Sequence, residues 1–164
     1  MIKFKHQTVP KFITEGFHSQ YAFPYATKLC NGIGLDIGCS QREWALPGSV
    51  PIDIKLDDEY DAYNLPEVDS GFDYIFSSHC LEHLPDYQAT LAGWVSKIKK
   101  GGTIFLYLPH PDCLYWQPNE MPTKLHLHTL TPMIMTELFK ESGVQNVFCS
   151  ERDLAYSFAI YGTI

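Results

Sequence analysis

Short apolar segments that end in a glycine or an acid alternate with amphipathic helical segments along residues 32–164. The first two of them, at residues 33–38 and 49–54, have the length and composition of buried strands. Further strands are predicted at residues 72–77, 103–108, 145–149 and 156–161. Strands that alternate with helices favour a mostly parallel sheet with helices on both faces, and such a sheet binds ligands at the carboxyl ends of its strands.

Two segments carry the pattern of capped helices. Asp86 precedes a stripe of apolar residues at helical spacing, which comprises Tyr87, Leu91, Trp94, Val95 and Ile98. Gly101-Gly102 is predicted to stop this helix in a left-handed conformation before the next strand. A second helix is predicted to begin at Thr131-Pro132 and to end at Gly143.

The connection after the first strand is unusually short. Only twelve residues, 39–50, separate Gly38 from Pro51, which leaves room for a turn or two of helix. The first helix of the fold is therefore predicted to be shortened. Residues 1–31 are rich in aromatic side chains but have no sustained helical or strand period, so we expect an N-terminal arm or lid with at most one short helix.

Charge and cysteine content narrow the function classes. The chain has 12 Lys and Arg against 19 Asp and Glu, a net charge of −7, which argues against a nucleic-acid partner. The five cysteines are widely spaced and form no Cys-x-x-Cys pair, so we expect reduced, mostly buried thiols. The longest strongly apolar run, 104–108, is far shorter than the ~20 residues that span a bilayer. These features predict a cytoplasmic protein with no membrane span.

Two strand ends indicate a nucleoside ligand. Gly38 follows the first strand, where the lack of a side chain lets the backbone approach a ligand closely. Asp53 ends the second strand fifteen residues later, and a carboxylate there can accept hydrogen bonds from both ribose hydroxyls. Ser40 and Glu43 stand where a dinucleotide site would have further glycines, so a pyrophosphate is not expected.

From these motifs, residues 32–163 resemble the class I S-adenosylmethionine-dependent methyltransferases, in particular their small type 11 group. Asp36-Ile37-Gly38 resembles the family's acid-hydrophobic-glycine motif, and Asp53 matches the acid that closes the next strand. Asp61-Ala62 with Leu65-Pro66 resembles the family's adenine-contacting segment. The segment 72–86, with its Leu-Glu-His, and the Lys-Lys-Gly-Gly at 99–102 resemble two later motifs.

The resemblance implies an α/β fold with a Rossmann-like, doubly wound, mostly parallel seven-stranded sheet, helices on both faces and a shortened first helix. It assigns residues 32–164 to the methyltransferase-like domain and makes S-adenosylmethionine the cofactor. By the same resemblance, Asp36 and the turn after it hold the methionine end, and Asp53 holds the ribose. The full set of expected cofactor-binding residues is Asp36, Gly38, Cys39, Ser40, Asp53, Ile54, Asp61, Ala62, Ser77, Ser78 and His79.

The expected reaction is methyl transfer to a small-molecule or glycan-like acceptor, by a monomer or a homodimer. Residues 110–130 have no clear helix or strand pattern and are the predicted substrate-recognition segment. A hydroxyl acceptor calls for a base that is active near neutral pH, and His110, His126 and His128 of this segment are the catalytic candidates, with His110 first. His79 is a further candidate base.

Structural explanations for the same residues stay open. Gly38 can serve strand-helix packing, Asp53 can cap a turn, and Asp36 can accept hydrogen bonds from the amides of the glycine turn. Glu82 and His83 can form a hydrogen-bonded pair that fixes their loop. Cys39-Ser40 departs from the family's glycine pattern. It therefore also stays open that the chain is a non-catalytic module that binds the cofactor or serves in protein interactions.

A zinc hydrolase is the remaining alternative. Residues 79–83 read His-x-x-Glu-His, a motif in which two histidines one helical turn apart bind zinc beside a glutamate base. That arrangement needs a continuous helix, but His79 directly follows a strand and Pro85 comes two residues after His83. We therefore predict no metal site, either there or among the three histidines of the 110–130 segment.

Overall fold

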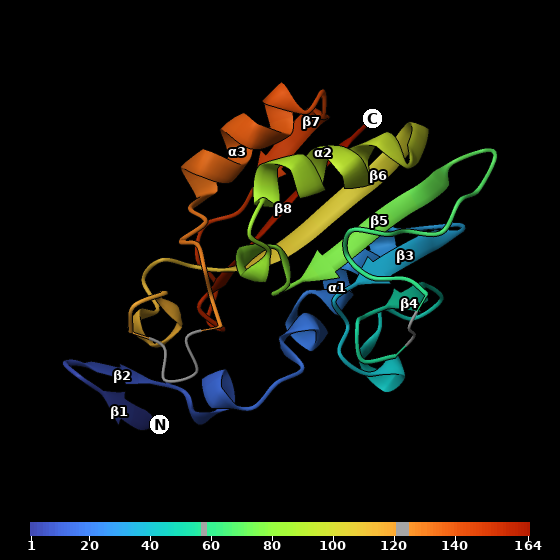
Figure 1. Ribbon diagram of the computed structural model, residues 1–164. Coiled ribbons are helices and arrows are strands. Elements are labelled where there is room, and N and C mark those ends of the chain that lie inside the picture. The colour runs from blue at the N-terminus through green and yellow to red at the C-terminus, as the bar shows by residue number, and fades with distance from the viewer. Residues whose placement is uncertain (57–58, 121–124) are drawn as a thin grey trace.

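In the computed structural model, which describes residues 1–56, 59–120 and 125–164, one mixed sheet of six strands forms the centre of the molecule (Figure 1). From one edge to the other its strands are β4 (Val50–Ile52), β3 (Gly34–Ile37), β5 (Phe72–Ser78), β6 (Ile98–Pro109), β8 (Ser157–Thr163) and β7 (Gln145–Cys149). The first four are parallel, and β8 is antiparallel to both of its neighbours. The α/β, mostly parallel architecture is as predicted.

The expected count of seven strands in this sheet is wrong for the described residues, which contribute six. The segment between β4 and β5 is where a further strand would be sought, and Leu65 is the one buried side chain among its described residues. A central strand of a parallel sheet needs a run of apolar side chains to cover both faces. The polar composition of this segment does not supply one.

Helices cover both faces of the sheet, as predicted. On one face lie α2 (Tyr87–Ser96) and α3 (Pro132–Glu141) (Figure 1). Their apolar side chains share a core with strand residues such as Ile75 and Ile104. On the other face, α1 (Phe23–Leu29) packs against their strand neighbours Phe76 and Phe105. Successive strand residues point to opposite faces, which is why adjacent positions belong to different cores. None of the described helices is long and apolar enough to cross a membrane.

The predicted helix caps are confirmed. The side chain of Asp86 accepts a hydrogen bond from the amide of Ala89 at 3.0 Å, and Thr131 caps α3 in the same way. The predicted role of Gly101-Gly102 as a helix stop is wrong, because α2 ends at Ser96 and both glycines lie within β6. Ile98, predicted as the last residue of the helical stripe, is the first residue of β6 and pairs with Phe72.

The N-terminal arm contains more regular structure than its sequence pattern indicated. It begins with an antiparallel hairpin, continues with two 3₁₀ helices, and ends in α1. The hairpin strands are β1 (Ile2–Phe4) and β2 (Gln7–Val9), and the 3₁₀ helices are Lys11–Thr14 and His18–Tyr21. Strands of three residues are too short to show a period in the sequence.

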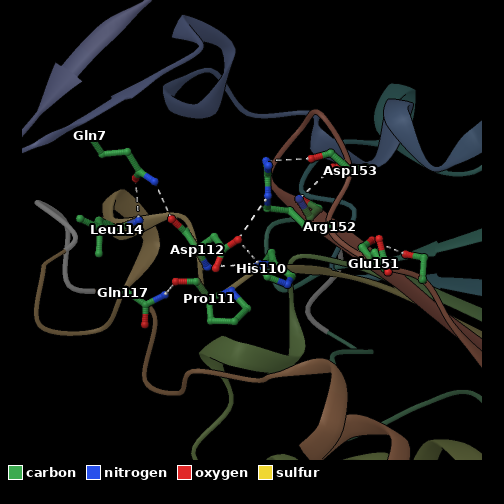
Figure 2. Close-up of polar contacts among 11 residues, drawn as sticks. Gln7, His110, Pro111, Asp112, Leu114, Gln117, Glu151, Arg152 and Asp153 are labelled. Atoms are coloured by element: carbon green, nitrogen blue, oxygen red, sulfur yellow. Dashed lines mark hydrogen bonds and ion pairs between the residues drawn. The ribbon is translucent and has the colours of Figure 1, made fainter.

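This arm is fastened to the segment that follows β6. The side-chain amide of Gln7 donates to the carbonyl of Asp112 at 2.6 Å and accepts from the amide of Leu114 at 2.9 Å (Figure 2). Ile13 packs with Trp116 in a small separate core. The arm therefore closes over the carboxyl ends of the central strands, where ligands of such sheets bind.

The connection from β3 to β4 is as short as predicted and contains only a 3₁₀ turn, Arg42–Trp44. Its far end is held by Asp36, whose Oδ2 accepts from the amide of Leu46 at 2.6 Å. Its near end turns at Gly38, which has φ +85° and donates to the carbonyl of Ile52 at 2.7 Å. A Cβ at Gly38 would lie 2.4 Å from the Cβ of Cys80, so the turn after β3 and the turn after β5 are in direct contact.

We expect the substitution Gly38→Ala to destabilise the fold more than Gly48→Ala. Both glycines have a positive φ, +85° and +89°, but a Cβ at Gly48 would meet nothing within 4 Å. Left-handed strain costs roughly 1–2 kcal/mol at either position, and overpacking against Cys80 adds about 1–3 kcal/mol at Gly38 alone. Urea unfolding of the two variants measures the difference in the free energy of unfolding. Equal losses would show that the contact with Cys80 costs nothing.

Candidate functional site

A cavity of about 310 Å³ opens at the carboxyl ends of β3 and β5, beneath the N-terminal arm. Six of the residues predicted to bind the cofactor line it: Asp36, Gly38, Cys39, Ser40, Ser78 and His79. Of the three predicted catalytic histidines, His126 lines the same cavity. Parallel strands bring their carboxyl ends to one edge of the sheet, which explains why residues from distant motifs meet here.

Asp53 lies directly beside the glycine turn, as the sequence predicted. Its Oδ2 accepts from the amide of Ser40 at 2.8 Å, and its Oδ1 accepts from the amide of Lys55 at 2.9 Å. The ammonium of Lys55 donates in turn to the hydroxyl of Ser40 at 2.9 Å. Asp53 is half-buried and stands outside the cavity lining, and Ile54 beside it is exposed. The carboxylate retains lone pairs for additional donors.

The other predicted cofactor residues take different places. The Oδ1 of Asp61 accepts from the amide of Asn64 at 2.8 Å and so closes a local turn. The carbonyl of Ala62 accepts from the indole of Trp94 at 2.8 Å, which fastens this segment to α2, away from the cavity lining. The hydroxyl of Ser77 donates to the carbonyl of Ile37 at 2.7 Å, so it joins β5 to β3.

Asp36 carries an unusual charge state for a strand residue. It is buried, and while its Oδ2 accepts from Leu46, its Oδ1 has no hydrogen-bond partner. Burial raises the pKa of this carboxyl to about 7, opposed by the hydrogen bond from Leu46 and assisted by the negative charge of Asp53. A free acceptor oxygen in the wall of a cavity is a place where a ligand donor or cation is stabilised.

Histidines with little exposure to solvent also line the cavity. The ring of His18, from the arm, stacks on that of His79 with 4.8 Å between centroids, and the Nε2 of His79 lies 2.9 Å from the hydroxyl of Ser157. Burial lowers the pKa of His18 and of His126 to about 4, so both rings are neutral at pH 7. Burial likewise holds the pKa of His79 well below its usual range.

The structure does not bring His110 and His128 to this cavity. His110 lies beyond the end of β6 with its Nδ1 3.5 Å from the carboxylate of Asp112, which also pairs with Arg152 at 3.3 Å (Figure 2). His128 points its Nε2 at the carbonyl of Leu84, 3.0 Å away. The preference for His110 as the base rested on its place directly after a strand, which sequence alone cannot relate to the cavity.

The His-x-x-Glu-His segment does not form the helix of a zinc hydrolase. His79 has φ +49°, and only a 3₁₀ turn, Leu81–His83, follows it. The hydrogen-bonded pair considered for Glu82 and His83 is not formed either, because neither carboxylate oxygen of Glu82 has a hydrogen-bond partner. Instead the Oε1 of Glu82 lies 3.7 Å from the Nε2 of His83 and 3.6 Å from that of His126. Burial raises the pKa of Glu82 to about 8.

Several cavity residues were missed by sequence reasoning. Phe17 and His18 come from the arm, Trp44 from the shortened connection, and Trp116 from the segment after β6. Phe17 and Trp44 stack with 5.3 Å between their centroids. Two signals were available: the aromatic content of residues 1–31, which predicts a lid, and the prediction that residues 110–130, which include Trp116, recognise the substrate.

Comparison with known proteins agrees with this architecture. A family model described as a methyltransferase domain matches residues 19–155. No curated protein matches the sequence. The fold is similar to that of a methyltransferase from Thermotoga maritima, with a TM-score of 0.65 and 15% identity over 93% of this chain and 91% of that one. A methyltransferase from Archaeoglobus fulgidus is similar with a TM-score of 0.61 and 18% identity, over 89% of this chain and 91% of that one.

A third similar structure is the phosphoethanolamine N-methyltransferase 2 of Haemonchus contortus, in complex with phosphomonomethylethanolamine and S-adenosylhomocysteine. Its TM-score is 0.63 at 12% identity, and the match covers 91% of this chain but 53% of that enzyme. Identities this low establish the fold alone, whereas the family model spans most of the sequence. The chain thus belongs to the methyltransferase domain family, and the methyl donor that this membership implies is S-adenosylmethionine.

Proposed function

We propose that this S-adenosylmethionine-dependent methyltransferase acts on a small-molecule or glycan-like acceptor, and that the cavity at the carboxyl ends of β3 and β5 is its reaction site. The observation that carries this proposal is the hydrogen bond from the amide of Ser40 to Asp53, at 2.8 Å. It places a turn that lines the cavity next to a carboxylate with acceptor capacity to spare. An adenosine-bearing ligand needs this pair of features.

The residues present fit the cofactor. The unpartnered Oδ1 of Asp36 is suited to accept from the ammonium of the methionine end, and the turn at residues 38–40 offers backbone groups beside it. Asp53 is suited to the ribose hydroxyls. The family resemblance assigns Ile54, Asp61 and Ala62 to the adenine end, although none of the three lines the cavity. Cys80 fills the space beside the Cα of Gly38. The cofactor would therefore contact the backbone of this turn and the side chains next to Gly38, rather than the Cα of Gly38 itself.

When bound, the cofactor supplies a methyl group on a positively charged sulfur, a reactive group that needs little activation. The chain's own contribution is to hold the acceptor in line and to exclude water. Ile13 and Phe17 of the arm line the cavity, which supports the assignment of residues 1–31 as a lid. Of the predicted bases, His79 and His126 line it too, and the neutral imidazole of His79 can accept a proton from a hydroxyl acceptor.

The size and charge of the site favour a small acceptor. A cavity of about 310 Å³ is near the lower end of the ~300–1,000 Å³ typical of small-molecule sites. The net charge of −7 disfavours a nucleic-acid acceptor. The similar enzyme from Haemonchus contortus, whose structure holds phosphomonomethylethanolamine, offers one precedent for a small ligand on this fold.

Calorimetric titration with S-adenosylhomocysteine, the demethylated cofactor, tests the reaction site directly. Saturable heat with one ligand per chain is expected, and transfer of labelled methyl groups to candidate amines, phenols and sugars then identifies the acceptor. A chain that releases no heat at millimolar ligand has no such site, and the proposal fails.

Asp53→Asn is expected to weaken binding of S-adenosylhomocysteine by about tenfold or more, because hydrogen bonds to a charged group contribute roughly 1.5–3 kcal/mol. The amide keeps one acceptor oxygen and leaves the side chain's size unchanged. Asp69→Ala, at an exposed acid in the same β4–β5 connection, is the control and should bind as the wild type does. Unchanged affinity in Asp53→Asn would mean that another residue holds the ribose.

Affinity for S-adenosylhomocysteine is expected to rise by up to about tenfold between pH 6 and pH 8 as Asp36 ionises, because the ligand's ammonium favours the carboxylate form. The pKa of Asp36, about 7, lies within this range, whereas burial raises the pKa of Cys30 and of Cys39 to about 12, so these neighbouring thiols stay neutral. Calorimetry across this pH range measures the effect. Asp36→Asn should remove the rise, and Asp53→Asn should retain it; a rise that persists in Asp36→Asn would exclude Asp36 as its source.

A further inference from the structure

Glu82 is a buried carboxyl group whose oxygens have no hydrogen-bond partner. Its side chain has an exposed fraction of 0%. Its backbone is fixed, because its carbonyl accepts from the amides of Leu127 at 2.9 Å and His128 at 3.2 Å. Burying a carboxyl without any hydrogen bond is costly, so a group placed this way calls for something that compensates it.

The rings of His83 and His126 turn their Nε2 atoms toward the carboxyl group of Glu82, and the Nδ1 of His79 lies 3.9 Å from the same Oε1. The Nδ1 of His83 lies 2.9 Å from the carbonyl of Leu125, and the Nδ1 of His126 lies 2.8 Å from the carbonyl of Trp116. A carbonyl oxygen only accepts, so each Nδ1 carries the proton. Each Nε2 is left with a lone pair, and both face the Oε1 of Glu82. Imidazole rings oriented by a backbone carbonyl in this way are typical of metal ligands.

The spacing of these atoms matches a shared ion rather than direct hydrogen bonds. The Oε1 of Glu82 is 3.7 Å from the Nε2 of His83 and 3.6 Å from that of His126, beyond the ~2.7–3.2 Å of a hydrogen bond. Ligands about 2.1 Å from a tetrahedral ion are about 3.4 Å apart. Among the described residues, these three side chains offer ligand atoms that all lie within 4.8 Å of one another.

We propose that Glu82, His83 and His126 bind a divalent transition-metal ion. Two imidazoles and one carboxylate form a donor set that suits Zn²⁺, and the cation would stabilise the ionised form of Glu82. His83 and His126 also line the cavity, so a remaining coordination position would be open to a ligand from that side. The ligand set differs from the zinc-hydrolase pattern, because His126 joins Glu82 and His83, whereas the Nε2 of His79 lies 2.9 Å from the hydroxyl of Ser157.

The metal site does not depend on the proposed methyl transfer, and metal titration tests it alone. The full-length protein is stripped with a chelator, dialysed and titrated with Zn²⁺, with calorimetry and elemental analysis as readouts. One tightly held equivalent per chain is expected, together with a rise in the thermal midpoint of the apoprotein, since a ligand that binds only the folded state stabilises it.

Glu82→Gln and His126→Gln should each weaken Zn²⁺ binding by 100-fold or more. His128→Gln is the matched control, because His128 lies in the same segment but its Nε2 faces the carbonyls of Leu84 and Pro85. Binding by the wild type and this control, with loss in the two ligand variants, supports the site. Absence of stoichiometric Zn²⁺ in the wild type overturns it, as does undiminished binding in both ligand variants.

If a ligand variant fails to fold, chemical modification of the wild-type protein tests the metal site instead. Diethyl pyrocarbonate modifies accessible imidazoles, and mass spectrometry of the peptides locates them. Zn²⁺ should protect the half-buried His83 while leaving the exposed His6 as reactive as before. Equal modification of His83 with and without Zn²⁺ overturns the proposal.

Discussion

The sharp turn at Gly38 is the constraint on which the rest of the molecule depends. The chain leaves the central strand β3 with φ +85°, and Cys80 from the turn after β5 occupies the space where a side chain would stand. The amide of Gly38 donates a hydrogen bond to the carbonyl of Ile52, so the same turn also sets the position of β4. The carboxyl group of Asp36 accepts a hydrogen bond from the amide of Leu46 and so fixes the path of the twelve-residue connection. The connection therefore brings Asp53 beside the turn without a long helix.

The parts of this arrangement that local sequence pattern determines were predictable. The strand that ends at Gly38, the caps at Asp86 and Thr131, and the meeting of Gly38 with Asp53 follow from periodicity, turn chemistry and the rule that parallel strands end at one edge. Gly101-Gly102 was misassigned because two glycines after a helical stripe are typical of a helix stop. Pairing of Ile98 with Phe72 extends β6 backward through them.

The sequence could not predict contacts between segments that lack the hydrophobic periodicity of a helix or a strand. His126 meets Glu82 because the amides of Leu127 and His128 bond to the carbonyl of Glu82, an interaction across more than forty residues. The arm reaches the cavity through the bonds of Gln7 to the segment after β6. Neither contact can be read from hydrophobic spacing, so the sequence ranked His110 first, whereas His126 is the one of the three candidates that lines the cavity.

Two buried carboxyl groups lie at the cavity: Asp36 lines it, and Glu82 lies behind the histidines that line it. Asp36 and Glu82 each have an oxygen without a hydrogen bond. Burial raises the pKa of Asp36 to about 7 and the pKa of Glu82 to about 8. The histidines nearby are held neutral by the same burial, so they do not supply the missing positive charge. A cation that enters the cavity therefore gains more from these acids than it would in water. The side at Asp36 suits the organic cation of a cofactor's methionine end, and the side at Glu82, with two imidazole lone pairs, suits a metal. The acids that cost the empty protein stability would thus be the source of its affinity for positively charged ligands.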